Sequence, residues 1–241
     1  MYNISSLVIA DRDMFYFNRL KIYRPKLKLL LISLLLFWIP LIVLGGIANE
    51  VSEPQPLYGG TAVLNYIHGN FSPKLSDIFL IATILGNAIS IVIVTGLIIG
   101  GLVYCKIFLQ ALILLFSVSS AELANLIIKQ PFKRDRLTLW STIIHEQSFS
   151  FPSGHAMASS ALAFSLIYIT WRTRFKRISV IFGGAFILAV GISRLYFGVH
   201  YPSDVIAGWL ASLIWVGIVV TALTSSKFSS YFRKFVDKPK S

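Results

Sequence analysis

Six apolar runs, separated by short polar segments, constrain the fold of this chain more than any other feature of its sequence. They lie at residues 27–47, 78–101, 107–128, 155–171, 178–196 and 205–223. An α-helix rises about 1.5 Å per residue, so about 20 apolar residues cross a hydrocarbon core of about 30 Å. Backbone polar groups must be satisfied internally within lipid, and helices do this. We therefore predict an all-α integral membrane protein, a bundle of six spanning helices.

The composition agrees with a membrane protein. Of the 241 residues, 56% are hydrophobic and 13% are charged, whereas a soluble domain carries about 25% charged residues. The formal net charge of +12 comes from basic clusters between the apolar runs. This distribution predicts anionic lipid headgroups as partners and no nucleic acid. Cys105 lies within an apolar segment, and we interpret it as a structural filler.

The order of the runs predicts three parts. Residues 1–26 would form a cytoplasmic N-terminal segment, either lying along the membrane surface or extending as a plain tail. Residues 27–224 would form the six-span domain, and residues 225–241 a basic cytoplasmic tail. The first run is expected to remain as a membrane anchor, because the segment before it does not resemble a cleavable signal peptide.

Two local features of the first half carry further expectations. Residues 49–76 are predicted to be a loop with a short interfacial helix around 62–68, and His68 within it is interpreted as a solvated side chain. Small residues allow helices to approach closely in lipid. Close helix contact is therefore predicted at Gly86, Gly96, Gly100 and Gly101.

The basic residues predict an orientation. With six spans, 16 of the 22 basic residues fall on one side of the membrane. The positive-inside rule makes that side cytoplasmic and places both termini there. Three polar blocks, at residues 129–136, 151–155 and 193–204, then share the opposite side. In a bacterial cell this would be the periplasmic face of the inner membrane.

These blocks contain the functional residues that we expect. They read K-Q-P-F-K-R-D-R from Lys129, F-P-S-G-H from Phe151 and S-R-L-Y-F-G-V-H-Y-P-S-D from Ser193. Ionisable groups at membrane depth are costly and indicate a functional site by default. A lysine seven residues before an arginine, then P-S-G-H, then S-R followed by H-x-x-x-D, resembles the signature of the type 2 phosphatidic acid phosphatase (PAP2) superfamily. Leu137 stands where that family usually has proline.

The cations and amides of the blocks suit a phosphate. Lys129, Arg136 and Arg194 supply three positive charges against the roughly −1.5 to −2 of a phosphate near neutral pH. Phosphoryl transfer mainly requires positioning and charge stabilisation. Ser153 precedes a predicted helix as its cap, so the amides of Ser153 and Gly154 are expected to point toward an anion.

The histidines and the carboxylate suit nucleophilic catalysis. Asp204 follows His200 by four residues, and a carboxylate that accepts from one imidazole nitrogen leaves the other free to attack. The resemblance implies that His200 forms a phosphohistidine, that Asp204 orients it, and that His155 first protonates the leaving oxygen and then activates water. Magnesium sites need clustered carboxylates, and the blocks hold only Asp135 and Asp204. We expect no metal and no cofactor.

The sequence therefore predicts a lipid phosphate phosphatase that acts on a phosphomonoester or a pyrophosphate. The resemblance implies phosphatidic acid, phosphatidylglycerol phosphate, diacylglycerol pyrophosphate or undecaprenyl pyrophosphate as substrates, and the motifs do not choose among them. A lipid phosphotransferase of the same fold is the alternative. An anion or lipid transporter is the rival from another class, although its ionisable residues would be spread along several spans.

Some polar residues receive no single role. Glu122 is interpreted either as a structural hydrogen-bond partner or as an ion-pair partner of the site. His145 and Glu146 either contact substrate or are solvated, and Lys133 and Arg134, which lie outside the motif, are interpreted as headgroup contacts.

Overall fold

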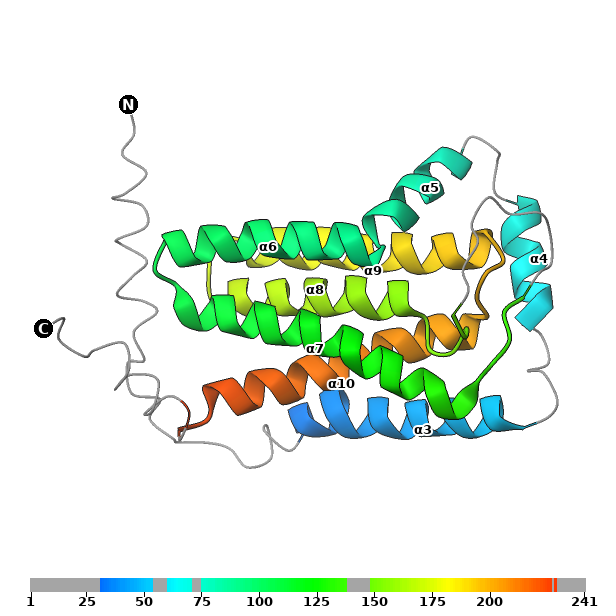
Figure 1. Cartoon of the computed structure of the whole chain (residues 1–241), viewed down its shortest axis with the longest axis horizontal. Helices are drawn as coiled ribbons and strands as arrows, with labels where there is room; N and C mark the ends of the chain where they lie inside the picture. The colour runs from blue at the N-terminus through cyan, green and yellow to red at the C-terminus, as the bar shows by residue number, and fades with distance from the viewer. Residues whose placement is uncertain (1–30, 54–59, 71–74, 138–147, 227, 229–241) are drawn as a thin grey trace, which may run out of the picture.

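The computed structural model describes residues 31–53, 60–70, 75–137, 148–226 and 228, and the regular structure in these ranges is helical. A π-helical segment, Leu34–Trp38, leads into the first long helix. The helices in chain order are α3 (Ile39–Ser52), α4 (Gly60–Asn70), α5 (Leu75–Leu85), α6 (Ala88–Tyr104), α7 (Phe108–Phe132), α8 (Gly154–Thr170), α9 (Lys176–Tyr196) and α10 (Pro202–Thr224). Most of them lie along the long axis of the molecule, and α4 lies across one end (Figure 1). The predicted all-α fold is confirmed.

Four helices in the described part of the chain are long and apolar enough to cross a membrane: Leu31–Ser52, α7, α9 and α10. The bent pair α5 and α6 makes a fifth span if it is counted as one. The remaining predicted span corresponds to α8, which is apolar but has only 17 residues. The described residues of each of the six apolar runs are thus mainly helical, while the number of full-length spans among the described residues is four or five.

The second predicted span is not one straight helix. It is divided into α5 and α6, which meet at an angle of 62°. Asn87 begins the new helix, because its side chain accepts a hydrogen bond from the Ser90 amide at 2.8 Å. Gly86 at the bend packs so closely that an added Cβ would lie 2.5 Å from Val190. The prediction of close contact is wrong for Gly96, Gly100 and Gly101, which have no described atom within 4 Å of that position.

The predicted loop at residues 49–76 contains more helix than expected. The first long helix continues to Ser52, and the interfacial helix extends over Gly60–Asn70. His68 lies on α4, with Nδ1 3.2 Å from the Tyr196 carbonyl and the two rings 5.5 Å apart. His68 is exposed, as expected for a solvated side chain, but it lies on a helix and contacts the end of α9, so its placement in a loop is wrong.

The centre of the bundle is α8, which packs against α6, α7, α9 and α10. Its buried side chains are mostly alanine and serine, and small side chains let surrounding helices approach closely. The start of α10 comes particularly near the start of α8. A Cβ on Gly208 would lie 2.8 Å from the Ser153 carbonyl oxygen, so glycine is needed where the first turns of α10 meet the second block.

Candidate active site

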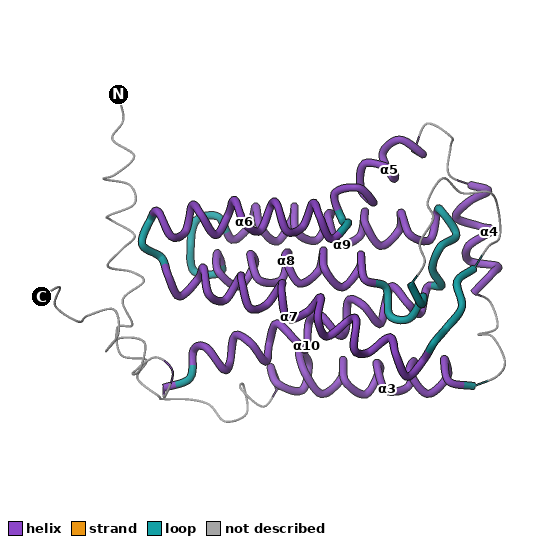
Figure 2. The backbone as a smooth tube through the Cα atoms, viewed as in Figure 1, coloured by secondary structure: helices purple, strands orange, loops and turns teal. Residues whose placement is uncertain are grey.

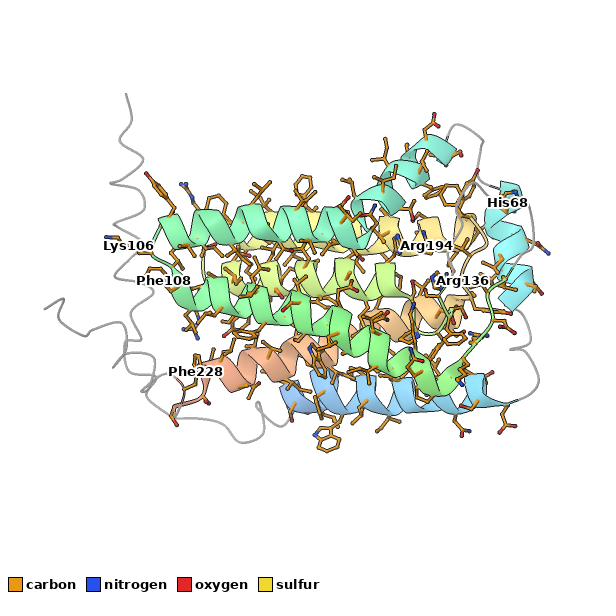
Figure 3. All side chains as sticks on the ribbon, in the orientation of Figure 1. His68, Lys106, Phe108, Arg136, Arg194 and Phe228 are labelled. Carbon is orange, nitrogen blue, oxygen red and sulfur yellow. The ribbon has the colours of Figure 1, made fainter. Side chains whose placement is uncertain are left out.

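The three polar blocks converge at one end of the bundle. The loops that follow α7, precede α8 and join α9 to α10 lie at the end that α4 covers (Figure 2). Arg136 and Arg194 lie at this end with His68, whereas Lys106 lies at the other (Figure 3). Arg172 and Lys176 flank the turn between α8 and α9, which lies at the Lys106 end (Figure 1). Lys106, Arg172 and Lys176 are therefore separated from the site by the length of the bundle.

His200 is held between a carboxylate and a guanidinium. It lies in the loop between α9 and α10, and its side chain is fully buried. Its Nδ1 lies 3.1 Å from Oδ2 of Asp204, and its Nε2 lies 3.0 Å from Nη1 of Arg136. A guanidinium only donates, so Nε2 must accept and Nδ1 must carry the ring proton toward Asp204. The two partners together select one neutral tautomer of His200.

Asp204 owes its position to the start of α10. Pro202 occupies the first turn of that helix, which suits its restricted φ. Asp204 follows in the same turn, and Oδ2 also accepts a hydrogen bond from the Tyr201 amide at 3.0 Å. The carboxylate therefore caps α10 and contacts His200 with the same oxygen.

Burial lowers the pKa of His200 from 6.5 to about 4. The hydrogen bond and the charge of Asp204 act in the opposite direction, and the charges of Arg194 and Arg136 lower the pKa further. Desolvation is thus the largest cause of the lowered pKa of His200. With this pKa the imidazole is neutral at physiological pH, so Nε2 keeps its lone pair.

The three expected phosphate-binding cations come from three different elements. Lys129 lies in the last turn of α7 and not in a loop, is 6% exposed, and donates to Ser148 Oγ at 3.3 Å. Arg136 follows α7 and donates to the carbonyls of Ser148 and Val199 at 2.6 and 3.1 Å. Arg194, in the last turn of α9, is completely buried.

Arg194 depends on a residue that the sequence did not single out. Its Nη1 donates to Oγ1 of Thr83 at 2.5 Å. Thr83 lies on α5 and is 4% exposed, and α5 packs against α9. The bend between α5 and α6 thus directs α5 onto the helix that carries Arg194.

The P-S-G-H block begins α8. The Ser153 side chain caps the helix, accepting from the Ala156 amide at 3.4 Å, and the Ser153 amide donates to the Asp204 carbonyl at 3.0 Å. Of the two amides expected to face an anion, that of Ser153 is therefore already engaged. A Cβ on Gly154 would lie 3.9 Å from Nζ of Lys129. His155 is partly buried in the first turn of α8.

Arg134 is part of the site, which contradicts its interpretation as a headgroup contact. Its Nη1 lies 2.6 Å from Oδ1 of Asp204 and 2.9 Å from Oγ of Ser203. Its guanidinium carbon lies 3.6 Å from the centre of the Tyr201 ring. Lys133 is exposed at the end of α7 with a left-handed φ of 43°.

The remaining candidates are less closely involved. Glu122 is partly buried on α7 and interacts electrostatically with Lys129. Leu137 is partly buried in the loop after Arg136. His145 and Glu146 lie outside the described residues. Among the described residues, three or more His, Cys, Asp or Glu side chains do not gather where they could hold a metal ion.

Known proteins resemble this chain in sequence. A family model described as the PAP2 superfamily matches residues 110–227. Phosphatidylglycerophosphatase B of Bacillus subtilis is 29% identical over 147 residues, which are 59% of this chain and 72% of that protein. Undecaprenyl-diphosphatase BcrC of Bacillus subtilis is 36% identical over 103 residues, 42% of this chain and 46% of that protein.

A solved structure shares the fold. It is described as the first transmembrane PAP2 type phosphatidylglycerolphosphate phosphatase from Bacillus subtilis, and it matches with a TM-score of 0.68 at 22% identity. The match covers 84% of this chain and 98% of that one. The blocks, the helical bundle and these relatives agree, and this chain carries a membrane domain of the PAP2 superfamily.

Proposed function

We propose that this protein hydrolyses the phosphomonoester or pyrophosphate of a membrane lipid through a phosphohistidine on His200. The observation that carries the proposal is the buried His200 itself, with Asp204 at Nδ1 and Arg136 at Nε2. A neutral imidazole that directs its lone pair toward a cation has the nucleophile and the phosphate-binding charge on the same side. The homologues are membrane lipid phosphatases, which supports the class of substrate.

The first step would transfer the phosphoryl group to His200. Nε2 forms a bond to phosphorus as the bond from phosphorus to the lipid oxygen breaks, and the Nδ1 proton stays directed at Asp204. Lys129, Arg136 and Arg194 would hold the phosphate oxygens, with Gly154 allowing close approach. His155 would donate a proton to the departing lipid oxygen.

The second step would return the enzyme to its starting state. Water attacks phosphorus, the bond from phosphorus to Nε2 breaks, and His155 takes the proton that water loses. Inorganic phosphate then leaves, and both histidines recover their initial protonation. The role proposed for Ser153 is to cap α8 and so to position Gly154 and His155.

We also propose that the reaction needs no metal. Asp204, the carboxylate at the centre of the site, already accepts hydrogen bonds from His200 and Arg134. Three cations surround the expected phosphate position and would oppose a divalent ion. Positive charge that other phosphatases obtain from metal ions would be supplied here by side chains.

The site would face the outer side of the membrane, which is the periplasm if the cell is bacterial. The support is the separation of the site from Lys106 and the basic turn after α8, which the positive-inside rule places in the cytoplasm (Figure 3). A reporter fused after Ser241 should read as cytoplasmic. An external reading would contradict this orientation.

Phosphate release by the purified protein tests the function. The protein in detergent would be given phosphatidylglycerol phosphate, phosphatidic acid and undecaprenyl pyrophosphate, with and without excess chelator. We expect release from at least one lipid, unchanged by chelator and inhibited by vanadate. Transfer to an added lipid alcohol instead of water would identify a phosphotransferase. Release abolished by chelator and restored by magnesium would contradict the metal-free mechanism.

A further inference from the structure

The side chain of Arg134 contacts three residues at and beside the proposed catalytic carboxylate. Its Nη1 reaches Asp204 Oδ1 at 2.6 Å and Ser203 Oγ at 2.9 Å, and its guanidinium lies over the Tyr201 ring. All three partners belong to the segment that begins α10. The Arg134 side chain is 12% exposed, so this arrangement is largely removed from solvent.

These contacts hold both oxygens of Asp204. Oδ2 accepts from His200 Nδ1 and from the Tyr201 amide, and Oδ1 accepts from Arg134. A carboxylate fixed at only one oxygen can rotate, whereas one fixed at both keeps its plane. Hydrogen bonds between charged groups are also among the strongest that proteins form.

Arg134 also changes how strongly Asp204 attracts a proton onto His200. The charged groups facing His200 are Asp204 from α10, Arg194 from α9 and Arg136 from the loop after α7. Lys129 on α7, His155 on α8 and Arg134 itself are further ionisable groups of the described part of the site. Asp204 alone among these favours imidazolium through its negative charge. Pairing Asp204 with Arg134 offsets that charge while leaving the hydrogen bond to Nδ1 in place.

We propose that Arg134 is a positioning residue, which fixes the Asp204 carboxylate and offsets its charge so that His200 stays neutral with Nε2 directed at the phosphate. The two arginines of the first block then have different tasks. Arg136 contacts Nε2, the reacting side of the ring, and Arg134 acts on Nδ1 through Asp204. This inference rests on the proposed role of His200.

Three variants separate this role from substrate binding. Arg134→Gln removes the charge, and Arg134→Lys keeps it but loses the planar fork. Lys133→Gln is the matched control, because it removes an equal charge from an exposed neighbour in the same loop, where solvent screens it. Size-exclusion elution in detergent would establish that each variant is folded.

The titration of His200 is the primary readout, and it requires no turnover. The chain has four histidines, so ¹⁵N-histidine spectra are simple, and His200→Asn identifies the signal. In Arg134→Gln we expect the pKa of His200 to rise by about one pH unit, as expected when a nearby opposing charge is removed. Arg134→Lys and Lys133→Gln should titrate like the wild type.

An unchanged His200 titration in folded Arg134→Gln would overturn the proposal, as would an equal rise in Lys133→Gln. If Arg134→Gln does not fold, Arg134→Lys still tests the proposal. Because Arg134→Lys keeps the positive charge beside Asp204, a shifted pKa of His200 in that variant would contradict the proposal.

Steady-state kinetics provide the second readout. Arg134→Gln should lower kcat by about 10-fold to 100-fold, by analogy with the residues that orient metal-binding histidines, with KM within a factor of about two. Arg134→Lys should recover part of kcat. A large rise in KM with unchanged kcat would show that Arg134 binds substrate instead. If the wild type releases phosphate from no lipid, the proposed function fails, whereas the histidine titration still tests Arg134.

Discussion

Nη1 of Arg136 lies 3.0 Å from Nε2 of His200, the atom that would attack phosphorus. The side chain of His200 is fully buried. In the proposed mechanism, a substrate phosphate would replace Nε2 as the partner of Nη1, which would bring phosphorus next to the lone pair. The guanidinium would thus prevent protonation of Nε2 before binding and stabilise phosphate charge afterwards.

The neutral state of His200 predicts that kcat/KM falls only at an unusually low pH on the acid side of its pH profile. Because burial lowers the pKa of His200 to about 4, its lone pair is lost only as the pH falls toward 4. An unshifted imidazole would lose it near pH 6.5. The measurement is kcat/KM between pH 4 and 7, divided by the fraction of substrate that is dianionic, which ³¹P NMR gives independently. The corrected values should be flat down to about pH 5.

A control separates the two histidines in that profile. His155→Ala, assayed with an aryl phosphate, should keep the same acid limb, since that limb belongs to His200. A corrected profile that falls with an apparent pKa near 6.5 in the wild type would contradict the neutral, buried nucleophile.

The role proposed for His155 predicts a dependence on the leaving group. A general acid matters less when the departing oxygen is already a weak base. His155→Ala should therefore lose about 100-fold or more in kcat on an alkyl lipid phosphate, and much less on a nitrophenyl phosphate. The two substrates are compared under the same conditions in both proteins. Equal losses on both would show that His155 does not protonate the leaving oxygen.

The contact between Thr83 and Arg194 predicts that a substitution far from the motifs in sequence weakens substrate binding. Thr83→Val keeps the shape of the side chain but removes the hydroxyl that accepts from Arg194 at 2.5 Å. Hydrogen bonds to charged groups contribute about 1.5–3 kcal/mol, so substrate KM should rise by about 10-fold or more. Thr83→Ser retains the hydroxyl and is the control. A normal KM in Thr83→Val would mean that Arg194 is positioned without α5.

The sequence predicted the helical bundle and the convergence of the three blocks, for reasons that are local. Each apolar run has the length and composition of a buried or lipid-facing helix, and their order alone brings the loops after α7, before α8 and after α9 to one end. The i, i+4 spacing of His200 and Asp204 likewise requires only one helical turn that begins at Pro202.

The features that the sequence did not predict depend on geometry between distant segments. Lys133 and Arg134 are adjacent cations, and the left-handed φ of Lys133 turns the chain so that one is exposed and the other contacts Asp204. Nothing in the local pattern distinguishes them. The contact of Thr83 with Arg194 joins residues 111 positions apart. It depends on the bend before α6, which a continuous apolar run conceals; Asn87 followed by Ser90 is the one local signal for it.

The phosphohistidine itself tests the central claim most directly. The purified protein would be mixed with a ³²P-labelled aryl phosphate and quenched in alkaline detergent within milliseconds, since phosphohistidine is stable in base and labile in acid. Wild type should carry acid-labile label, His155→Ala should accumulate more of it because hydrolysis by water is slowed, and His200→Asn should carry none. Label that persists in His200→Asn, or the absence of label from both wild type and His155→Ala during turnover, would contradict the account.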